Sequence, residues 1–137
     1  MIAEDDDAIR QRLRELAESF GARIVAEAKN GREAIDACER LSPDLILLDI
    51  AMPVMGGFRA ARRLRISMPA LCIVFISQYA DVCYAEEALR IGARAYVTKN
   101  AAATELGAAM SAISAGECFV SPIAAKSRLF PLQPFSP

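Results

Sequence analysis

Short apolar runs alternate along this chain with segments in which apolar residues recur every three or four positions. An uninterrupted apolar run such as 45–48 or 71–76 predicts a strand covered on both faces, and the wider spacing predicts an amphipathic helix. We expect strands at residues 1–3, 23–27, 45–48, 71–76 and 95–98, each followed by a helix. Five strand–helix units in succession predict an α/β fold: a doubly wound, five-stranded parallel sheet with helices on both faces.

Capping signals support the helices that this periodicity predicts. Asn30 is followed three residues later by Glu33, which resembles a capping box at the start of the second helix. Asp81 can cap the fourth helix, and Gly92 can end it. These signals place helix starts and ends between the expected strands, as the α/β fold requires.

Charge and hydropathy exclude several classes of function. The 137 residues carry 16 basic and 17 acidic side chains, a net charge of −1, without the basic stripe of a nucleic-acid-binding surface. No apolar run approaches the roughly 20 residues that cross a membrane. No basic segment precedes an apolar one at the N-terminus, so we expect a cytoplasmic protein without an export signal.

Cysteine and histidine usage narrows the chemistry further. The four cysteines lack CxxC spacing and lie within apolar patterns, which favours small buried side chains in a reducing compartment over disulfides or redox roles. Histidine is absent, which removes histidine acid–base chemistry and histidine metal ligands. The chain therefore cannot donate a phosphoryl group from histidine and can only receive one.

Polar residues follow four of the expected strands at the point where each strand ends. Glu4 and Asp5 come after the first strand, Asp49 after the third, Ser77 after the fourth and Lys99 after the fifth. The carboxyl ends of parallel strands meet at one edge of the sheet, where open α/β sheets place their ligand sites. Three carboxylates, a hydroxyl and an ammonium gathered there indicate a site for a divalent metal and a phosphoryl group.

The segments that carry these residues resemble, in order, a response-regulator receiver domain of two-component signalling. The matching segments are 2–6 (IAEDD), 43–57 (PDLILLDIAMPVMGG), 76–77, 92–93 and 96–99. The resemblance implies the flavodoxin/CheY-like fold with strand order 2-1-3-4-5, a receiver domain over residues 1–120, and a linker or tail over 121–137 with no second folded domain. Residues 115–122 resemble the NarL/FixJ-type subfamily, whose receivers usually precede a LuxR-type DNA-binding domain; we expect no such domain in these 137 residues.

The resemblance also implies how the acidic residues act. Asp49 would accept a phosphoryl group from a sensor histidine kinase. The Mg²⁺ ion that such domains use would be held by Asp5, Asp49 and the backbone carbonyl of Ala51, with Glu4 acting through water. A hard, oxygen-liganded cation suits this donor set, and phosphoryl transfer relies on such positioning and charge stabilisation.

Three further residues would bind the phosphoryl group and switch the domain. Lys99 would pair with a phosphoryl oxygen, Ser77 would be drawn toward the new charge, and Tyr96 would change rotamer in response. The face made by the fourth helix, fifth strand and fifth helix would then change and control a transcriptional or protein-interaction output. The implied partners are the histidine kinase and a second copy in a possible homodimer, with no direct nucleic-acid binding and no membrane.

The chain departs from the family pattern in three places. Only three residues precede Glu4, so an interior strand is short and leaves ladder positions of both neighbours unpaired. Asn100 follows Lys99 where many receivers have a cis-proline. The tail is apolar and proline-rich: we interpret it as a truncated or frayed end, or as a segment whose Phe130 and Phe135 dock on the domain's switch face or on a partner.

Two other functions remain open beside the phosphorylation switch. The first is a pseudo-receiver, which would use the same fold as a phosphorylation-independent platform for protein interactions. The second is an enzyme that forms an aspartyl phosphate, like haloacid-dehalogenase phosphatases, but that class has a second aspartate where this chain has Ala51. We therefore expect a signalling domain with only self-catalysed phosphoryl transfer and weak autodephosphorylation, not an enzyme.

Overall fold

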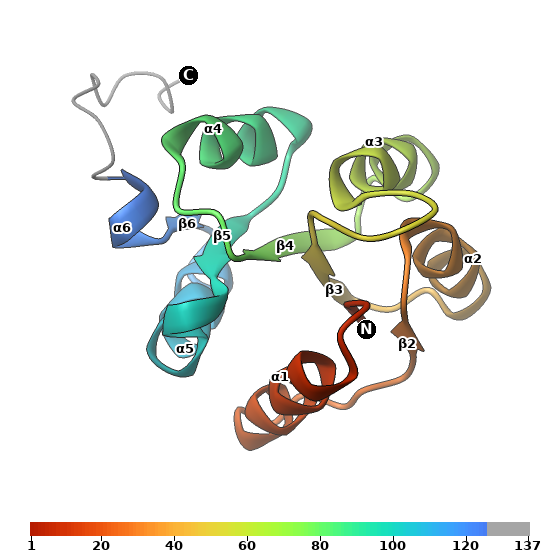
Figure 1. Cartoon of the computed structure of the whole chain (residues 1–137), viewed down its shortest axis with the longest axis horizontal. Helices are drawn as coiled ribbons and strands as arrows, with labels where there is room; N and C mark the ends of the chain where they lie inside the picture. Colours follow the sequence, from red (N-terminus) through yellow and green to blue (C-terminus); the bar gives the residue numbers. More distant parts are fainter. Residues whose placement is uncertain (126–137) are drawn as a thin grey trace.

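The computed structural model describes residues 1–125 and arranges them around one parallel sheet (Figure 1). The strands are β1 (Ile2–Ala3), β2 (Glu27–Ala28), β3 (Leu45–Asp49), β4 (Cys72–Ser77), β5 (Ala95–Thr98) and β6 (Phe119–Val120). The helices are α1 (Asp7–Ser19), α2 (Gly31–Leu41), α3 (Gly57–Ser67), α4 (Val82–Ile91), the 3₁₀ turn η1 (Lys99–Ala101), α5 (Ala102–Ser114) and α6 (Pro122–Ala125). The predicted strand–helix alternation is confirmed.

Within the described residues the strand order is β2-β1-β3-β4-β5-β6, and every pair is parallel. This confirms the predicted doubly wound order 2-1-3-4-5, but the sheet has a sixth strand that the sequence did not predict. β6 pairs with β5, where Ala95 lies opposite Phe119. Two residues are too few to show a periodicity, so β6 is defined only by its partner.

Helices cover both faces of the sheet, as Figure 1 shows. The side chains of α1 and α5 pack on one face, around Leu47, Val74 and Val97. Those of α2, α3 and α4 pack on the other face, around Leu48 and Phe75. This division explains why β3 and β4 are apolar at successive positions: alternate residues of each strand enter different cores.

The predicted strand over residues 23–27 is wrong in its extent. β2 covers only Glu27 and Ala28, which pair with Ile2 and Ala3 of β1. Residues 23–25 have no strand partner because the backbone of β1 does not extend beside them. A groove of about 700 Å³ lies there, lined mainly by apolar side chains of α1, α5 and the 41–47 segment, among them Phe20, Leu41, Leu47, Leu106 and Met110.

The predicted caps are confirmed at the start of α2 and at the end of α4, but Asp81 does not cap α4 through its side chain. Asn30 Oδ1 accepts a hydrogen bond from Glu33 N at 2.9 Å, and Glu33 Oε1 accepts one from Lys29 N at 2.9 Å. Asp81 occupies the N-cap position of α4 without a side-chain capping bond, and Gly92 ends that helix with a φ of 108°. Glycine suits this position because it adopts positive φ without steric cost.

Residues after position 120 continue the fold as far as the described chain reaches. Ser121 N donates to Tyr96 O at 2.7 Å, and α6 packs beside α4. The predicted boundary between domain and tail at residue 120 stays a prediction. The proposed docking of Phe130 and Phe135 falls on residues 126–137, outside the described part of the chain. Across residues 1–125, no helix is both long and apolar enough to cross a membrane.

Candidate functional site

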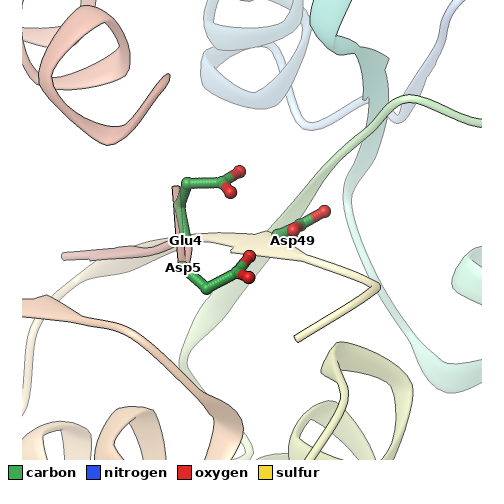
Figure 2. Close-up of side chains that lie close together, drawn as sticks. All are labelled: Glu4, Asp5 and Asp49. Atoms are coloured by element: carbon green, nitrogen blue, oxygen red, sulfur yellow. The ribbon is translucent and has the colours of Figure 1, made fainter. Parts of the chain in front are cut away.

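The predicted polar residues meet at the carboxyl edge of the sheet. Glu4 and Asp5 follow β1, and Asp49 is the last residue of the neighbouring strand β3. Ser77 ends β4, and Lys99 directly follows β5. Figure 2 shows the carboxylates of Glu4, Asp5 and Asp49 directed into the same space from β1 and β3.

These three side chains form a tight acidic cluster. Each offers one carboxylate oxygen, and the three oxygens all lie within 4.8 Å of one another. Glu4 is only 1% exposed and Asp49 only 4%, whereas Asp5 is exposed to solvent. Glu4 Oε2 is held by the Asp6 backbone N–H at 3.1 Å. Two of the three carboxylates are therefore buried together, which is unfavourable without a balancing cation.

Lys99 supplies part of that balance. Its Nζ lies 2.8 Å from Glu4 Oε1 and 3.3 Å from Asp49 Oδ2. Burial opposes the lysine charge, but the contact with Glu4 and the charge of Asp49 outweigh burial and raise the pKa of Lys99. The ammonium is therefore held charged between the two buried carboxylates.

One ammonium does not compensate for this cluster. Burial, reinforced by the charge of Glu4, raises the pKa of Asp49 to about 6, although Lys99 acts in the opposite direction. Glu4 Oε1 is buried and has the Lys99 charge beside it, but no aligned hydrogen-bond donor among the described residues. Three carboxylates and one ammonium leave two negative charges, and all candidate ligand atoms are oxygens. The cluster therefore fits a hard divalent cation such as Mg²⁺.

Close backbone packing places the loop that follows Asp49. Gly57 N donates to Ile50 O at 2.7 Å, and a Cβ on Gly57 would lie 2.0 Å from the Asp49 carbonyl oxygen. Only glycine allows the start of α3 to approach the end of β3 so closely. Ala51 lies exposed in this loop, and the contribution of its carbonyl to a metal site stays a prediction.

The two predicted switch residues converge on a residue that the sequence did not identify. Ser77 Oγ accepts a hydrogen bond from Tyr79 N at 3.0 Å, and the Tyr96 hydroxyl donates to Tyr79 O at 2.6 Å. Tyr96 is fully buried, and burial raises its pKa to about 12. Tyr79 makes both contacts through its backbone, so no side-chain motif could have revealed its position.

A second unpredicted residue anchors the segment around Lys99. Glu105 of α5 accepts from the Ser121 hydroxyl at 2.8 Å and, more weakly, from Thr98 N at 3.3 Å. Its carboxylate thus joins the end of β5 to the segment after β6. No cis peptide occurs in the described residues, so Asn100 follows Lys99 through a trans bond, and Lys99 still reaches Glu4 and Asp49.

This chain is similar in sequence to response regulators of two-component signalling. The model of the family described as "Response regulator receiver domain" matches residues 1–111. The response regulator GacA of Pseudomonas viridiflava is 32% identical over 136 residues, which is 98% of this chain but only 64% of that relative. UvrY of Escherichia coli is 26% identical and also spans 98% of this chain, which covers 62% of UvrY.

Solved structures show the same likeness. A two-component response regulator of the LuxR family from Aurantimonas sp. superposes with a TM-score of 0.86 at 33% identity, over 92% of this chain and 91% of that one. The isolated receiver domain of Salmonella RcsB superposes with a TM-score of 0.84 at 20% identity, over 91% and 94% of the two chains, and shows the fold alone.

Proposed function

Because this chain belongs to the response regulator receiver domain family, we propose that it is a switch whose Asp49 accepts a phosphoryl group from a sensor histidine kinase. Receiver domains of two-component response regulators are phosphorylation-switched signalling domains rather than classical enzymes. The observation that carries the proposal is the placement of Asp49: it is buried beside Glu4, and the Lys99 ammonium contacts both carboxylates.

The proposed reaction is a displacement at phosphorus. A carboxylate oxygen of Asp49 attacks, forming a P–O bond and an acyl phosphate. The P–N bond of phosphohistidine, or the P–O bond of a small acyl phosphate, breaks, and its electron pair leaves with the imidazole or the carboxylate. A pKa of about 6 leaves Asp49 largely ionised at neutral pH, as a nucleophile must be. Lys99 lies within ion-pair distance of the attacking group and can contact a transferred phosphoryl oxygen.

The residues of the acidic cluster would hold Mg²⁺. Asp5 and Asp49 are the direct carboxylate ligands in this proposal, Glu4 acts through water, and Ala51 contributes its carbonyl. When bound, the cation neutralises charge between the carboxylates and the phosphoryl oxygens. Asp5 is the exposed member, so it faces the side from which ion and donor arrive.

The output of the switch is proposed to pass through Ser77 and Tyr96. The Ser77 hydroxyl accepts a bond from Tyr79 N, which leaves its own hydrogen to donate to a phosphoryl oxygen. Tyr96 lies on β5 and contacts the loop after Ser77, so movement of that loop changes the α4–β5–α5 face. A related protein of Bacillus subtilis, 29% identical over 123 residues, is named transcriptional regulatory protein LnrK. We propose a transcriptional or protein-interaction output, exerted in the cytoplasm, with a second copy of the chain as a further partner in a homodimer.

The experiment that tests the proposal is intact-mass analysis after incubation with acetyl phosphate, with and without Mg²⁺. Wild type is expected to gain one phosphoryl group only with Mg²⁺, and Asp49→Asn to gain none. Asp36→Asn serves as the matched control, because Asp36 is an exposed aspartate of α2. No gain in folded wild type, with acetyl phosphate and with a panel of histidine kinases, would overturn the proposal and favour the pseudo-receiver function.

A further inference from the structure

An aromatic cluster joins the switch residues to helices α3 and α4. The ring of Tyr79 lies 4.8 Å from that of Tyr84 on α4, measured between centroids, and Tyr84 stacks on Phe58 of α3 at 6.1 Å. Phe58 meets Phe75 of β4 edge-on at 5.1 Å. Phe75 lies two residues before Ser77 on the same strand, so the contacts form a closed path from β4 through the loop, α4 and α3 and back to β4.

Tyr79 is the residue of this path whose backbone is hydrogen-bonded to the hydroxyls of both Ser77 and Tyr96. Its N–H donates to Ser77 Oγ, and its carbonyl accepts from the Tyr96 hydroxyl. A hydroxyl oxygen can accept one bond while its hydrogen donates another. Ser77 can therefore bind a phosphoryl oxygen without releasing Tyr79, and the segment from Ser77 to Tyr79 then moves as one piece. The Tyr79 ring belongs to this segment, so its contact with Tyr84 depends on where the segment lies.

We propose that Tyr79 is a positioning residue of the switch, which transmits displacement of Ser77 through the Tyr84 and Phe58 rings to the surface between α3 and α4. This inference rests on the proposed phosphorylation of Asp49, but it adds an output surface apart from the α4–β5–α5 face. Tyr79, Tyr84 and Phe58 are all half-buried, so the rings reach the surface between α3 and α4. Arg62 of α3 and Glu87 of α4 also form an ion pair at 2.5 Å, so a charged contact joins the two helices beside the Tyr84 and Phe58 rings.

The chain carries its own spectroscopic probe for this movement. It has three tyrosines and no tryptophan, and all three tyrosines (Tyr79, Tyr84 and Tyr96) belong to this arrangement. Near-ultraviolet circular dichroism of the tyrosines therefore reports on Tyr79 and Tyr84 of the cluster together with Tyr96, without interference from tryptophan. A change on phosphorylation is expected in wild type.

Hydrogen–deuterium exchange locates the effect. On phosphorylation with acetyl phosphate and Mg²⁺, amides at the start of α3 are expected to exchange about two- to tenfold faster, the ratio that corresponds to losing the contact between the Tyr84 ring and the Phe58 ring of α3. Amides of α2, which contributes no ring to the cluster, are expected to stay unchanged. Tyr84→Leu removes the central ring, so its α3 amides should exchange fast before phosphorylation and change little afterwards. Tyr84→Phe keeps the ring and should behave as wild type.

Occupancy of Asp49 is measured by intact mass in the same samples, which separates the two proposals. If wild type takes no phosphoryl group, the proposed function fails. If wild type is phosphorylated while exchange in α3 stays unchanged, or if Tyr84→Leu responds as wild type does, the inference fails and the function stands. Should Tyr84→Leu not fold, Phe58→Leu interrupts the same path from the α3 side, and the same outcomes apply.

Discussion

Replacing Asp49 by asparagine should make the metal-free protein more stable at neutral pH. The pKa of Asp49 is raised from 3.8 to about 6, chiefly by burial and then by the charge of Glu4. A difference of about 2 pKa units corresponds to about 3 kcal/mol that the folded protein loses when this side chain is charged. Asparagine has nearly the same shape and no charge, so Asp49→Asn should recover up to this amount at pH 7.5.

The pH dependence of this gain gives its signature. Because the folded-state pKa is above the unfolded value, the folded protein binds the proton more tightly between pH 4 and 6. Wild type is therefore destabilised as pH rises through this window, relative to the variant. The advantage of Asp49→Asn should fall from about 3 kcal/mol at pH 7.5 to roughly half at pH 5 and about 0.5 kcal/mol at pH 4.

Urea unfolding in EDTA at these three pH values measures the effect, with Asp36→Asn on the exposed face of α2 as the control. Saturating Mg²⁺ should stabilise wild type by mass action, about 2.7 kcal/mol at a hundred times its dissociation constant, and should narrow the gap to the variant. If Asp49→Asn were no more stable than wild type at pH 7.5, or if its gain did not depend on pH, the charge argument would be refuted.

Two other predictions concern the backbone, one beside the site and one at the opposite edge of the sheet. Gly57→Ala should destabilise the domain by about 3 kcal/mol or more, because its Cβ would lie 2.0 Å from the Asp49 carbonyl oxygen; a loss below 1 kcal/mol in urea unfolding would contradict this packing. Adding four alternating apolar and β-branched residues before Met1 should raise the unfolding midpoint, because they can pair with residues 23–25 and fill the groove beside β3. A Gly-Ser extension of equal length is the control, and equal midpoints for the two extensions would show that the groove does not accept a strand.

The sequence predicted the site more completely than the edges of the sheet. Asp49, Ser77 and Lys99 each follow an apolar run that forms a strand in the structure, and parallel strands necessarily bring their carboxyl ends together. The apolar runs and their order along the chain were therefore enough to predict that these side chains lie near one another. The raised pKa of Asp49 was not predictable in this way, because it depends first on how deeply Asp49 itself is buried and then on the charges of Glu4 and Lys99 beside it.

The wrong extent of β2 and the two features that the sequence did not predict, β6 and the role of Tyr79, have a common physical origin. Residues 23–26 have the composition of a strand, but a strand needs a partner, and the pairing with Ile2 and Ala3 admits only Glu27 and Ala28. β6 gave no signal of its own and exists through its pairing with β5. Tyr79 is important through its backbone N–H and carbonyl, which every residue except proline possesses. Each of these features depends on tertiary contacts rather than on local pattern.

The acidic cluster and the short strand β1 both affect the stability of the pairing between β1 and β3. Glu4 and Asp5 follow β1, which is only two residues long, while Asp49 ends the five-residue strand β3. Repulsion between Glu4 and Asp49 therefore acts between β1 and β3 and opposes their pairing, and Lys99 bridges the two carboxylates only in part. A divalent cation at this position would replace that repulsion by attraction and hold β1 against β3.

Occupancy of the site is thus expected to stabilise the strands β1 and β2 more than the strands β4 and β5. Site-resolved hydrogen exchange with and without Mg²⁺ would show the difference. Equal protection of all strands by Mg²⁺ would mean that the acidic cluster does not limit the pairing of β1.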